Sequence, residues 1–301
     1  GKSLYSHNQE GVIKYTGSGS VILLGRRSRI NGVKITVSST DVDYVFNTDN
    51  RIFSTSSATL MTEVDDIEVY FDNNADSYES TLINIVASNK DYNGVSGFHN
   101  QHYSNIRVAG QTKIKYGIKI CVSFDNPYDD STNNILPWIT NMRFNHIWLG
   151  CPETAIKIHR ENNSGTDIDY SNIVRTEHMM FTDVASQDSN SEHTKKFYDV
   201  EWCMAEFINC LPWDYHHVTN RGEKYNTIGQ GALLSEVNAR RSPIDVAEFP
   251  SVTSTTPEEN PAYFLKTFFN FHSNIDRKYD FININFIFVP IILIFYIFNL
   301  T

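Results

Sequence analysis

A four-residue pattern that recurs along this 301-residue chain constrains its fold most strongly. In each copy a small residue, an Asn or an Asp precedes an apolar, a charged and a second apolar residue. Because successive side chains of a β-strand point to opposite faces, the two apolar residues share one face and the charge takes the other. The pattern therefore predicts short strands with an apolar inner face. The copies begin at Gly32, Asp66, Asn105, Gly117, Asn141, Ala155 and Asp199.

The way the copies repeat predicts stacked strands. Between Gly11 and about Ile244 no long segment has apolar residues at i, i+3, i+4 and i+7, so a helical repeat is not expected. Asn105, Asn141, Asn172 and Asp199 follow one another at intervals of 36, 31 and 27 residues, an irregular repeat typical of a solenoid. Leucine-rich repeats would require recurring Leu, which is absent. We therefore predict an all-β fold, a right-handed, single-stranded parallel β-helix of the pectate-lyase-like solenoid type.

The expected core follows from the same alternation. Asn and Asp at the start of a run suit a sharp corner, since these residues tolerate a left-handed backbone. The alternative fold is an antiparallel β-sandwich with long loops, but the sequence has only two Asn-Gly hairpin signals, Asn31-Gly32 and Asn93-Gly94. In the β-helix, Lys34, Lys119 and Lys157 should point outward. The residues expected inside are Val33, Ile35, Ile106, Val108, Ile118, Ile120, Ile156 and Ile158.

The composition divides the chain into three parts. We expect residues 1–247 to form the β-helix, 248–262 a linker or exit strand, and 263–301 a separate apolar tail. The tail is either a membrane segment or read-through translation, because nearly all its residue types can be encoded by A and T alone. The first residue is not Met and no secretory signal is evident, so a longer chain is expected upstream. Deleting the tail at about Pro261 should leave thermal stability unchanged.

Charge and cysteine usage exclude several classes of function. The formal net charge of -10 without a basic run argues against nucleic acid as a partner. The four Cys residues lack CxxC spacing and are expected to be buried free thiols. Asp72, Asn73 and Asp76 do not match an EF-hand loop, and His99 with His102 lacks a nearby third zinc ligand. No metal and no cofactor is therefore predicted.

Two segments carry a resemblance to a known group of proteins. They are YTGSGSVILLGRRSRINGVKI from Tyr15 to Ile35 and NMRFNHIWLGCPETAIKI from Asn141 to Ile158. Each has the form of a strand, a small-residue corner and an apolar-charged-apolar strand. The chain from about Gly11 to Ile244 thereby resembles bacteriophage tail-spike and pre-neck appendage proteins of the pectate-lyase-like β-helix type. The Gly-Asp-rich segment that many of these proteins carry before the first rung is absent.

This resemblance implies a function and partners. Such proteins form trimers, attach to the virion tail, contact other tail proteins, and bind or cleave host surface polysaccharide. One alternative is a secreted, extracellular bacterial polysaccharide lyase or hydrolase of the same fold, and another is a non-catalytic structural virion β-helix. An upstream virion-anchoring region would favour the first hypothesis, and a signal peptide the second.

Glycan hydrolysis usually requires two carboxylates about 5 to 10 Å apart. Since neighbouring rungs lie about 4.8 Å apart, carboxylates on successive rungs could satisfy this spacing. Glu177 and Glu201 are the pair we would expect, and Asp214 is a further catalytic candidate. The alternative is that these charges simply solvate the outer face, as most strand charges do.

The residues best suited to sugar contacts concentrate between Asn141 and His217. Aromatic rings stack on sugars, and Arg and His donate hydrogen bonds. The alternatives are loop packing for the segment after Pro212 and a local ion pair for His159-Arg160-Glu161. The predicted substrate-binding residues are Trp148, Arg160, Arg175, His178, Trp213, Tyr215 and His216.

Overall fold

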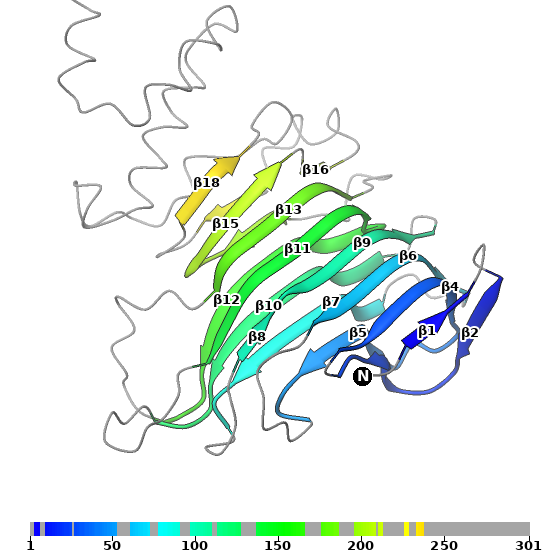
Figure 1. The fold of residues 1–301 in the computed structure, drawn as a ribbon, viewed down its shortest axis with the longest axis horizontal. Coiled ribbons are helices and arrows are strands. Elements are labelled where there is room, and N and C mark those ends of the chain that lie inside the picture. Colours follow the sequence, from blue (N-terminus) through cyan, green and yellow to red (C-terminus); the bar gives the residue numbers. More distant parts are fainter. Residues whose placement is uncertain are drawn as a thin grey trace, which may run out of the picture.

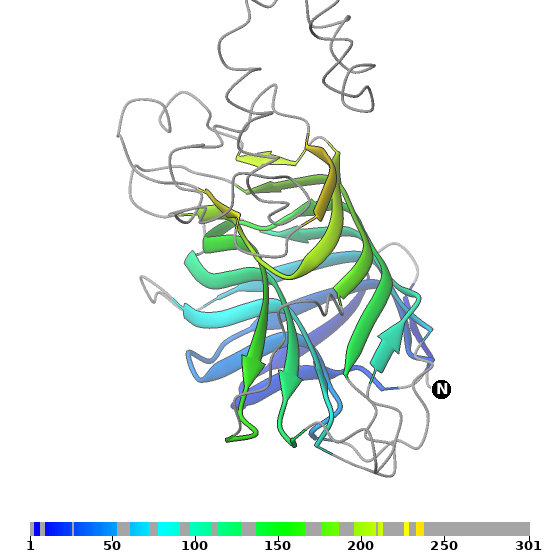
Figure 2. The same cartoon turned by 90° about the vertical axis from the view of Figure 1, so that its left-hand side faces the viewer.

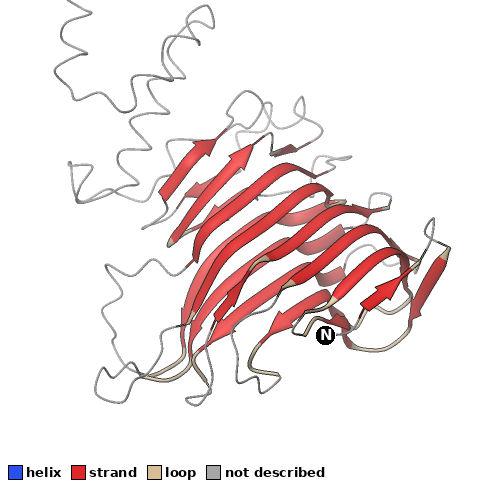
Figure 3. Cartoon of the chain, in the orientation of Figure 1, coloured by secondary structure: helices blue, strands red, loops and turns tan. Residues whose placement is uncertain are grey.

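The computed structural model describes most of the chain up to Val237. The described residues are 3–6, 10–25, 27–52, 61–72, 78–90, 97–109, 113–127, 137–165, 176–186, 196–208, 210–212, 226–228 and 233–237. Within them every regular element is a β-strand (Figure 3). In this part of the chain no helix could cross a membrane.

The strands form two parallel sheets between which the chain passes repeatedly (Figure 1). Sheet A, with 11 strands, comprises β1 (Ser3–Tyr5), β2 (Gly11–Tyr15), β4 (Arg29–Val37), β6 (Thr62–Phe71), β8 (Gly97–His99), β9 (Gln101–Val108), β11 (Trp138–Trp148), β13 (Thr176–Ser186), β15 (Cys203–Ile208), β16 (Leu211–Pro212) and β18 (Leu233–Val237). Sheet B, with 7 strands, comprises β3 (Gly19–Leu23), β5 (Val42–Asp49), β7 (Tyr78–Ser88), β10 (Lys113–Phe124), β12 (Cys151–Asn162), β14 (Lys196–Val200) and β17 (Asn226–Ile228).

The fold is a parallel β-helix, as the sequence predicts. In sheet A, β4 pairs with β6, β6 with β9, β9 with β11 and β11 with β13, all parallel. Sheet B stacks β5, β7, β10, β12 and β14 in the same way. Figure 2 shows the strands lying one above another in chain order. We call one full turn of the chain through both sheets a coil. The antiparallel sandwich is wrong for the described residues, because each strand pairs in parallel with the equivalent strand of the next coil and not with a hairpin neighbour.

Apolar side chains fill the space between the two sheets. All eight residues predicted to lie inside are at most 2% exposed. They stack on their counterparts in the next coil, for example Ile67 on Ile106 and Ile118 on Ile156. Lys34, Lys119 and Lys157 lie outside this core and are partly exposed, as expected.

A column of left-handed residues bends the strands of sheet A. The register places Gly32, Asp66, Asn105, His146 and Asp183 in successive coils, with φ of 69°, 53°, 50°, 54° and 52°. Asn and Asp adopt this backbone more easily than most residues, which confirms their predicted place at corners. At Gly32 a Cβ would also lie only 2.1 Å from the carbonyl oxygen of Ser6, so this corner requires Gly.

Candidate functional site

The outer face of sheet B carries rows of polar side chains. Ile120 and Ile158 point into the core, so the residues flanking them on β10 and β12 point outward. The register then pairs three sets of outward side chains on these two strands: Lys119 with Lys157, Cys121 with His159, and Ser123 with Glu161. We call the outward side chains of β10, β12 and β14, with Arg51 after β5, the sheet B face.

Cys121, His159 and Glu161 form a compact cluster on this face, toward the C-terminal ends of β10 and β12. One potential ligand atom from each lies within 4.8 Å of the other two. The Nε2 of His159 is 3.0 Å from Oε1 of Glu161. Cys121 is buried, whereas the side chain of Glu161 is 36% exposed, so the cluster opens to solvent on the Glu161 side. It thus combines a thiol, an imidazole and a carboxylate at one accessible place.

The pKa values of Glu161 and Cys121 indicate which chemistry the cluster can support. The hydrogen bond with His159 lowers the pKa of Glu161 to about 2 despite partial desolvation, and the charges of His159, Lys119 and Arg51 add to the effect. Burial raises the pKa of Cys121 well above its usual range, so the free thiol stays protonated near neutral pH. Since the thiolate is the nucleophilic form, the arrangement does not favour cysteine nucleophilic catalysis.

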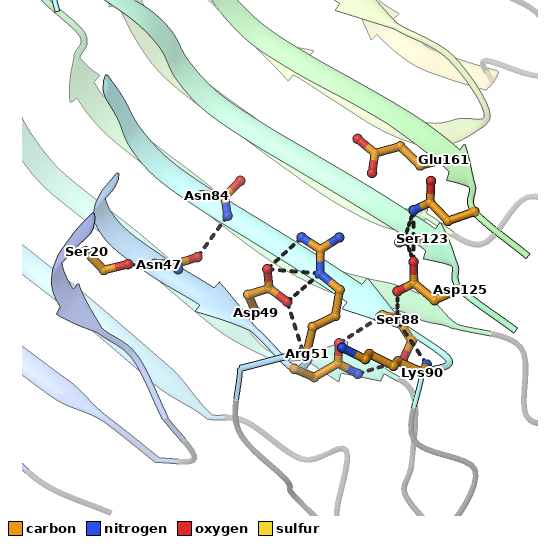
Figure 4. A network of polar contacts seen from close by, with 12 residues as sticks. Ser20, Asn47, Asp49, Arg51, Asn84, Ser88, Lys90, Ser123, Asp125 and Glu161 are labelled. Atoms are coloured by element: carbon orange, nitrogen blue, oxygen red, sulfur yellow. Dashed lines mark hydrogen bonds and ion pairs between the residues drawn. The ribbon is translucent and has the colours of Figure 1, made fainter. Parts of the chain in front are cut away.

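Cations next to the cluster are held by partners of their own. Arg51 donates to Asp49 through Nη2 at 2.7 Å and through Nε at 3.0 Å (Figure 4). The ammonium groups of Lys119 and Lys157 lie 5.8 and 5.5 Å from the centre of the Tyr116 ring. This places an aromatic ring and two amines on the same face.

A hydrogen-bond network joins the strand ends beside the cluster. Ser88 donates to one carboxylate oxygen of Asp125, while Ser123 and Asn163 donate to the other at 2.9 Å each (Figure 4). Burial opposes ionisation of Asp125, but these three hydrogen bonds outweigh it and keep the pKa of Asp125 below its usual range. Asn89 accepts from the backbone N–H of Asp125 at 2.8 Å. The network holds three coils together.

A second ladder lies further along sheet B. The amide of Asn84 donates to Asn47 at 2.8 Å, and the amide of Asn47 donates to Ser20 at 2.9 Å (Figure 4). Asn47 and Asn84 are buried. Because these amides are buried and bond to one another, they are not available to a ligand. The accessible part of the sheet B face lies over β10, β12 and β14.

The structure puts the two predicted catalytic carboxylates in different sheets. Glu177 lies in β13 of sheet A, opposite Thr140. Glu201 directly follows β14 of sheet B, and its backbone N–H donates to Ile158 at 2.9 Å. Since Val200 pairs with Ile158, the register continued by one residue sets Glu201 beside His159. The backbone of Glu201 therefore lies beside His159, whereas Glu177 is part of a sheet A strand.

Three predicted substrate-binding residues are described and do not form one group. Trp148 ends β11 in sheet A and is half-buried. Its neighbours Ile147 and Leu149 point into the core, so the Trp148 side chain points outward. His178 is exposed on β13 at a left-handed corner with φ of 53°. Arg160 on β12 stacks on Trp202, with its guanidinium carbon 3.4 Å from the ring centre. The other predicted site residues, Arg175, Trp213, Asp214, Tyr215 and His216, lie outside the described residues, as does the tail at 263–301.

The Cys121–His159–Glu161 cluster was missed by the sequence analysis. From the sequence, a local ion pair was one interpretation of His159-Arg160-Glu161, and the contact between His159 and Glu161 is confirmed. Cys121 was treated only as a buried thiol, which is also correct. The missing step was register: Gly117-Ile118-Lys119-Ile120 and Ala155-Ile156-Lys157-Ile158 are copies of one pattern, and aligning them puts Cys121 opposite His159.

Comparisons with known proteins add no relatives to this description. No protein-family model matches the chain, and neither a curated protein nor a solved structure is significantly similar to it.

Proposed function

We propose that this β-helix is a polysaccharide-binding module that binds its glycan on the sheet B face. One observation carries the proposal: hydrogen-bonding side chains repeat in register over neighbouring parallel strands, with Lys119 beside Lys157 and Lys157 beside Asp199. Parallel strands repeat about every 4.8 Å. A polymer with hydroxyl groups at regular intervals can therefore contact equivalent side chains on several strands.

The chemistry of the face favours a glycan over a highly charged polymer. Lys157 lies 3.6 Å from Asp199, and Arg51 pairs with Asp49, so these cations are locally balanced by acids. Tyr116 supplies an aromatic ring of the kind that stacks on sugars. Paired charges and rings present many hydrogen-bond donors and acceptors without a strong net field.

The proposal extends to the biological setting that the sequence pattern suggests. We place the module in a bacteriophage tail spike or appendage, as a homotrimer on the virion tail that contacts other tail proteins and host surface polysaccharide. The parallel β-helix supports this setting only at the level of fold. A secreted polysaccharide lyase or hydrolase and a purely structural β-helix are the alternative outcomes of the tests below.

A glycan array of bacterial envelope polysaccharides tests binding directly. We expect specific binding by the wild type and a loss of about tenfold in affinity for Lys119→Ala, equivalent to one charged hydrogen bond. Lys34→Ala is the matched control, since Lys34 is also an outward Lys between two buried residues but lies in sheet A. Trp148→Ala probes the sheet A face. Failure to bind any envelope glycan would favour the structural β-helix.

Cleavage requires a separate assay, since binding does not imply turnover. The backbone register brings Glu201 beside His159, two residues before Glu161 on β12, so Glu161 with Glu201 is a second carboxylate pair to test alongside Glu177 with Glu201. Glu161→Gln and Glu201→Gln should each lower reducing-end release by orders of magnitude if the face is hydrolytic, with glycan binding largely kept. Turnover unchanged in both variants would exclude this pair. Glu177→Gln tests the pair of Glu177 with Glu201 in the same assay.

A further inference from the structure

We propose that Cys121, His159 and Glu161 form a binding site for one transition-metal ion of the zinc class. The three side chains come from two adjacent parallel strands, with Cys121 directly opposite His159 and Glu161 two residues further along β12. One donor atom from each lies within 4.8 Å of the others. The proposal does not depend on glycan binding.

The donor set matches the coordination chemistry of zinc. Zinc in proteins is bound by Cys sulfur at about 2.3 Å, His nitrogen at about 2.0–2.1 Å and carboxylate oxygen at about 2.0–2.2 Å. The 3.0 Å between Nε2 of His159 and Oε1 of Glu161 allows one ion to contact both atoms. Metal binding releases the thiol proton of Cys121 to solvent. The resulting thiolate and an imidazole favour zinc and similar metals over calcium or magnesium, which prefer oxygen alone.

The second ring nitrogen of His159 bears on the protonation state of the site. This atom, Nδ1, is buried and has no hydrogen-bond partner among the residues that the structure describes. A buried polar atom without a partner is uncommon in native structures and can indicate a missing ion or water. Nδ1 cannot bind the same ion as Nε2, so it is the position for the proton of the neutral imidazole that a metal requires.

The scaffold holds the three residues in place before any ion binds. Ile120 and Ile158, next to Cys121 and His159, are fully buried in the core, so both strands are fixed by packing. The guanidinium of Arg51 is paired with Asp49, and the side chain of Glu161 is 36% exposed. Three protein ligands with an open side are typical of zinc sites that keep a fourth position for water or substrate.

Cobalt substitution tests the site in the full chain. After chelator treatment and dialysis, the protein is titrated with Zn²⁺ by calorimetry and with Co²⁺ by absorption spectroscopy, both without glycan. We expect one equivalent to bind and a thiolate-to-cobalt charge-transfer band to appear in the near ultraviolet. Cys121→Ser should abolish the band and weaken Zn²⁺ binding on the order of 100-fold. Loss of a residue that only contacts a metal ligand already costs about 10- to 100-fold in affinity, and loss of a ligand itself should cost at least as much.

Two further variants separate metal binding from folding. Cys203→Ser is the matched control, because Cys203 is another buried thiol but lies in sheet A, and it should keep both the band and the affinity. His159→Gln should weaken binding with the Co²⁺ band shifted or lost. No saturable binding by the wild type, or equal affinity in the wild type, Cys121→Ser and His159→Gln, would overturn the proposal. A failed glycan array would leave this result unchanged, so the two proposals fail separately.

Discussion

At the scale of single residues, the left-handed corners of sheet A explain why the sequence repeats Asn and Asp. A residue with a Cβ strains the left-handed backbone, which Gly adopts readily and Asn, Asp and His adopt more often than other residues. Asp66 and Asn105 occupy this column, while Gly32 stands where the backbone of Ser6 approaches. His146 and Asp183 continue the column, and Nδ1 of His146 lies 3.3 Å from Oδ2 of Asp183. In each coil, the bend of the sheet A strand therefore depends on the single residue that occupies this column.

Replacing Asn105 tests the energetic role of a corner. Asn105→Ala should be about 1 kcal/mol less stable than Asn105→Gly, because Ala pays the left-handed penalty and Gly does not. Both variants lose the hydrogen bond that Asn105 donates to Asp65 at 2.9 Å, so their difference isolates the backbone. Urea unfolding of the two variants measures it. Equal stability would mean that the corner can relax to another backbone conformation.

Asp125 should make stability depend on pH in a defined direction. Its pKa is lowered in the folded state, so its contribution is present above the unfolded value of about 3.9 and is lost as pH falls through the folded pKa. The melting-temperature difference between wild type and Asp125→Asn should thus be constant from about pH 7 to 5 and shrink below about pH 4. Partial solvent exposure keeps this difference small.

A matched carboxylate gives the control for this experiment. Glu79 is exposed and pairs with Lys115 at the surface, so Glu79→Gln should change the melting temperature little at any pH. A difference for Asp125→Asn that stays constant down to pH 2 would show that Asp125 is not stabilised in its ionised form.

Individual residues could be predicted well where their role is local. The inward position of Val33 and the outward position of Lys119 follow from alternation alone, and both are confirmed. The site was harder to predict because it depends on residues far apart in sequence. Cys121 and His159 meet only through strand pairing, and the places of Glu177 on a sheet A strand and of Glu201 after a sheet B strand also follow from that pairing.

At the scale of elements, stacked aromatic rings lock the strands of sheet A in register. Tyr103, Phe144, Phe181 and Phe207 form a continuous inner stack on β9, β11, β13 and β15, with centroid distances of 5.3, 4.7 and 4.8 Å. Offset stacking of rings at this distance adds to the burial of their area. The stack ties four coils together along one line.

Truncating the middle ring should loosen several coils at once. Phe181 is fully buried and contacts a ring on each side, so Phe181→Ala should lower the free energy of unfolding by about 3–5 kcal/mol. Phe181→Leu keeps most of the volume and should cost clearly less. Chemical denaturation of both variants measures the difference. A cost below about 1 kcal/mol for Phe181→Ala would mean that the stack does not hold the register.

Element-level prediction succeeded for strand type and failed for strand length. The copies that begin at Gly117 and Ala155 mark only the centres of β10 and β12, which each span 12 residues. Their ends contain Cys121, Ser123, His159 and Glu161, which lack a pattern visible in one coil alone. Polar residues at strand ends are positioned by the neighbouring coil, so the sequence pattern of one strand does not indicate their partners.

At the scale of the whole molecule, the β-helix turns local repeats into extended surfaces. Each coil adds one outward row to sheet B, and rows from β10, β12 and β14 align into the proposed binding face. The same alignment brings together the proposed metal ligands. Both proposals therefore rest on the parallel register of sheet B.

A crystal structure of the protein with an array-selected oligosaccharide tests this central claim most directly. We predict that the glycan lies across β10, β12 and β14, with contacts to Lys119, Lys157 and the region of Tyr116. A glycan bound instead on sheet A around Trp148, or no bound glycan at saturating concentration, would contradict the account.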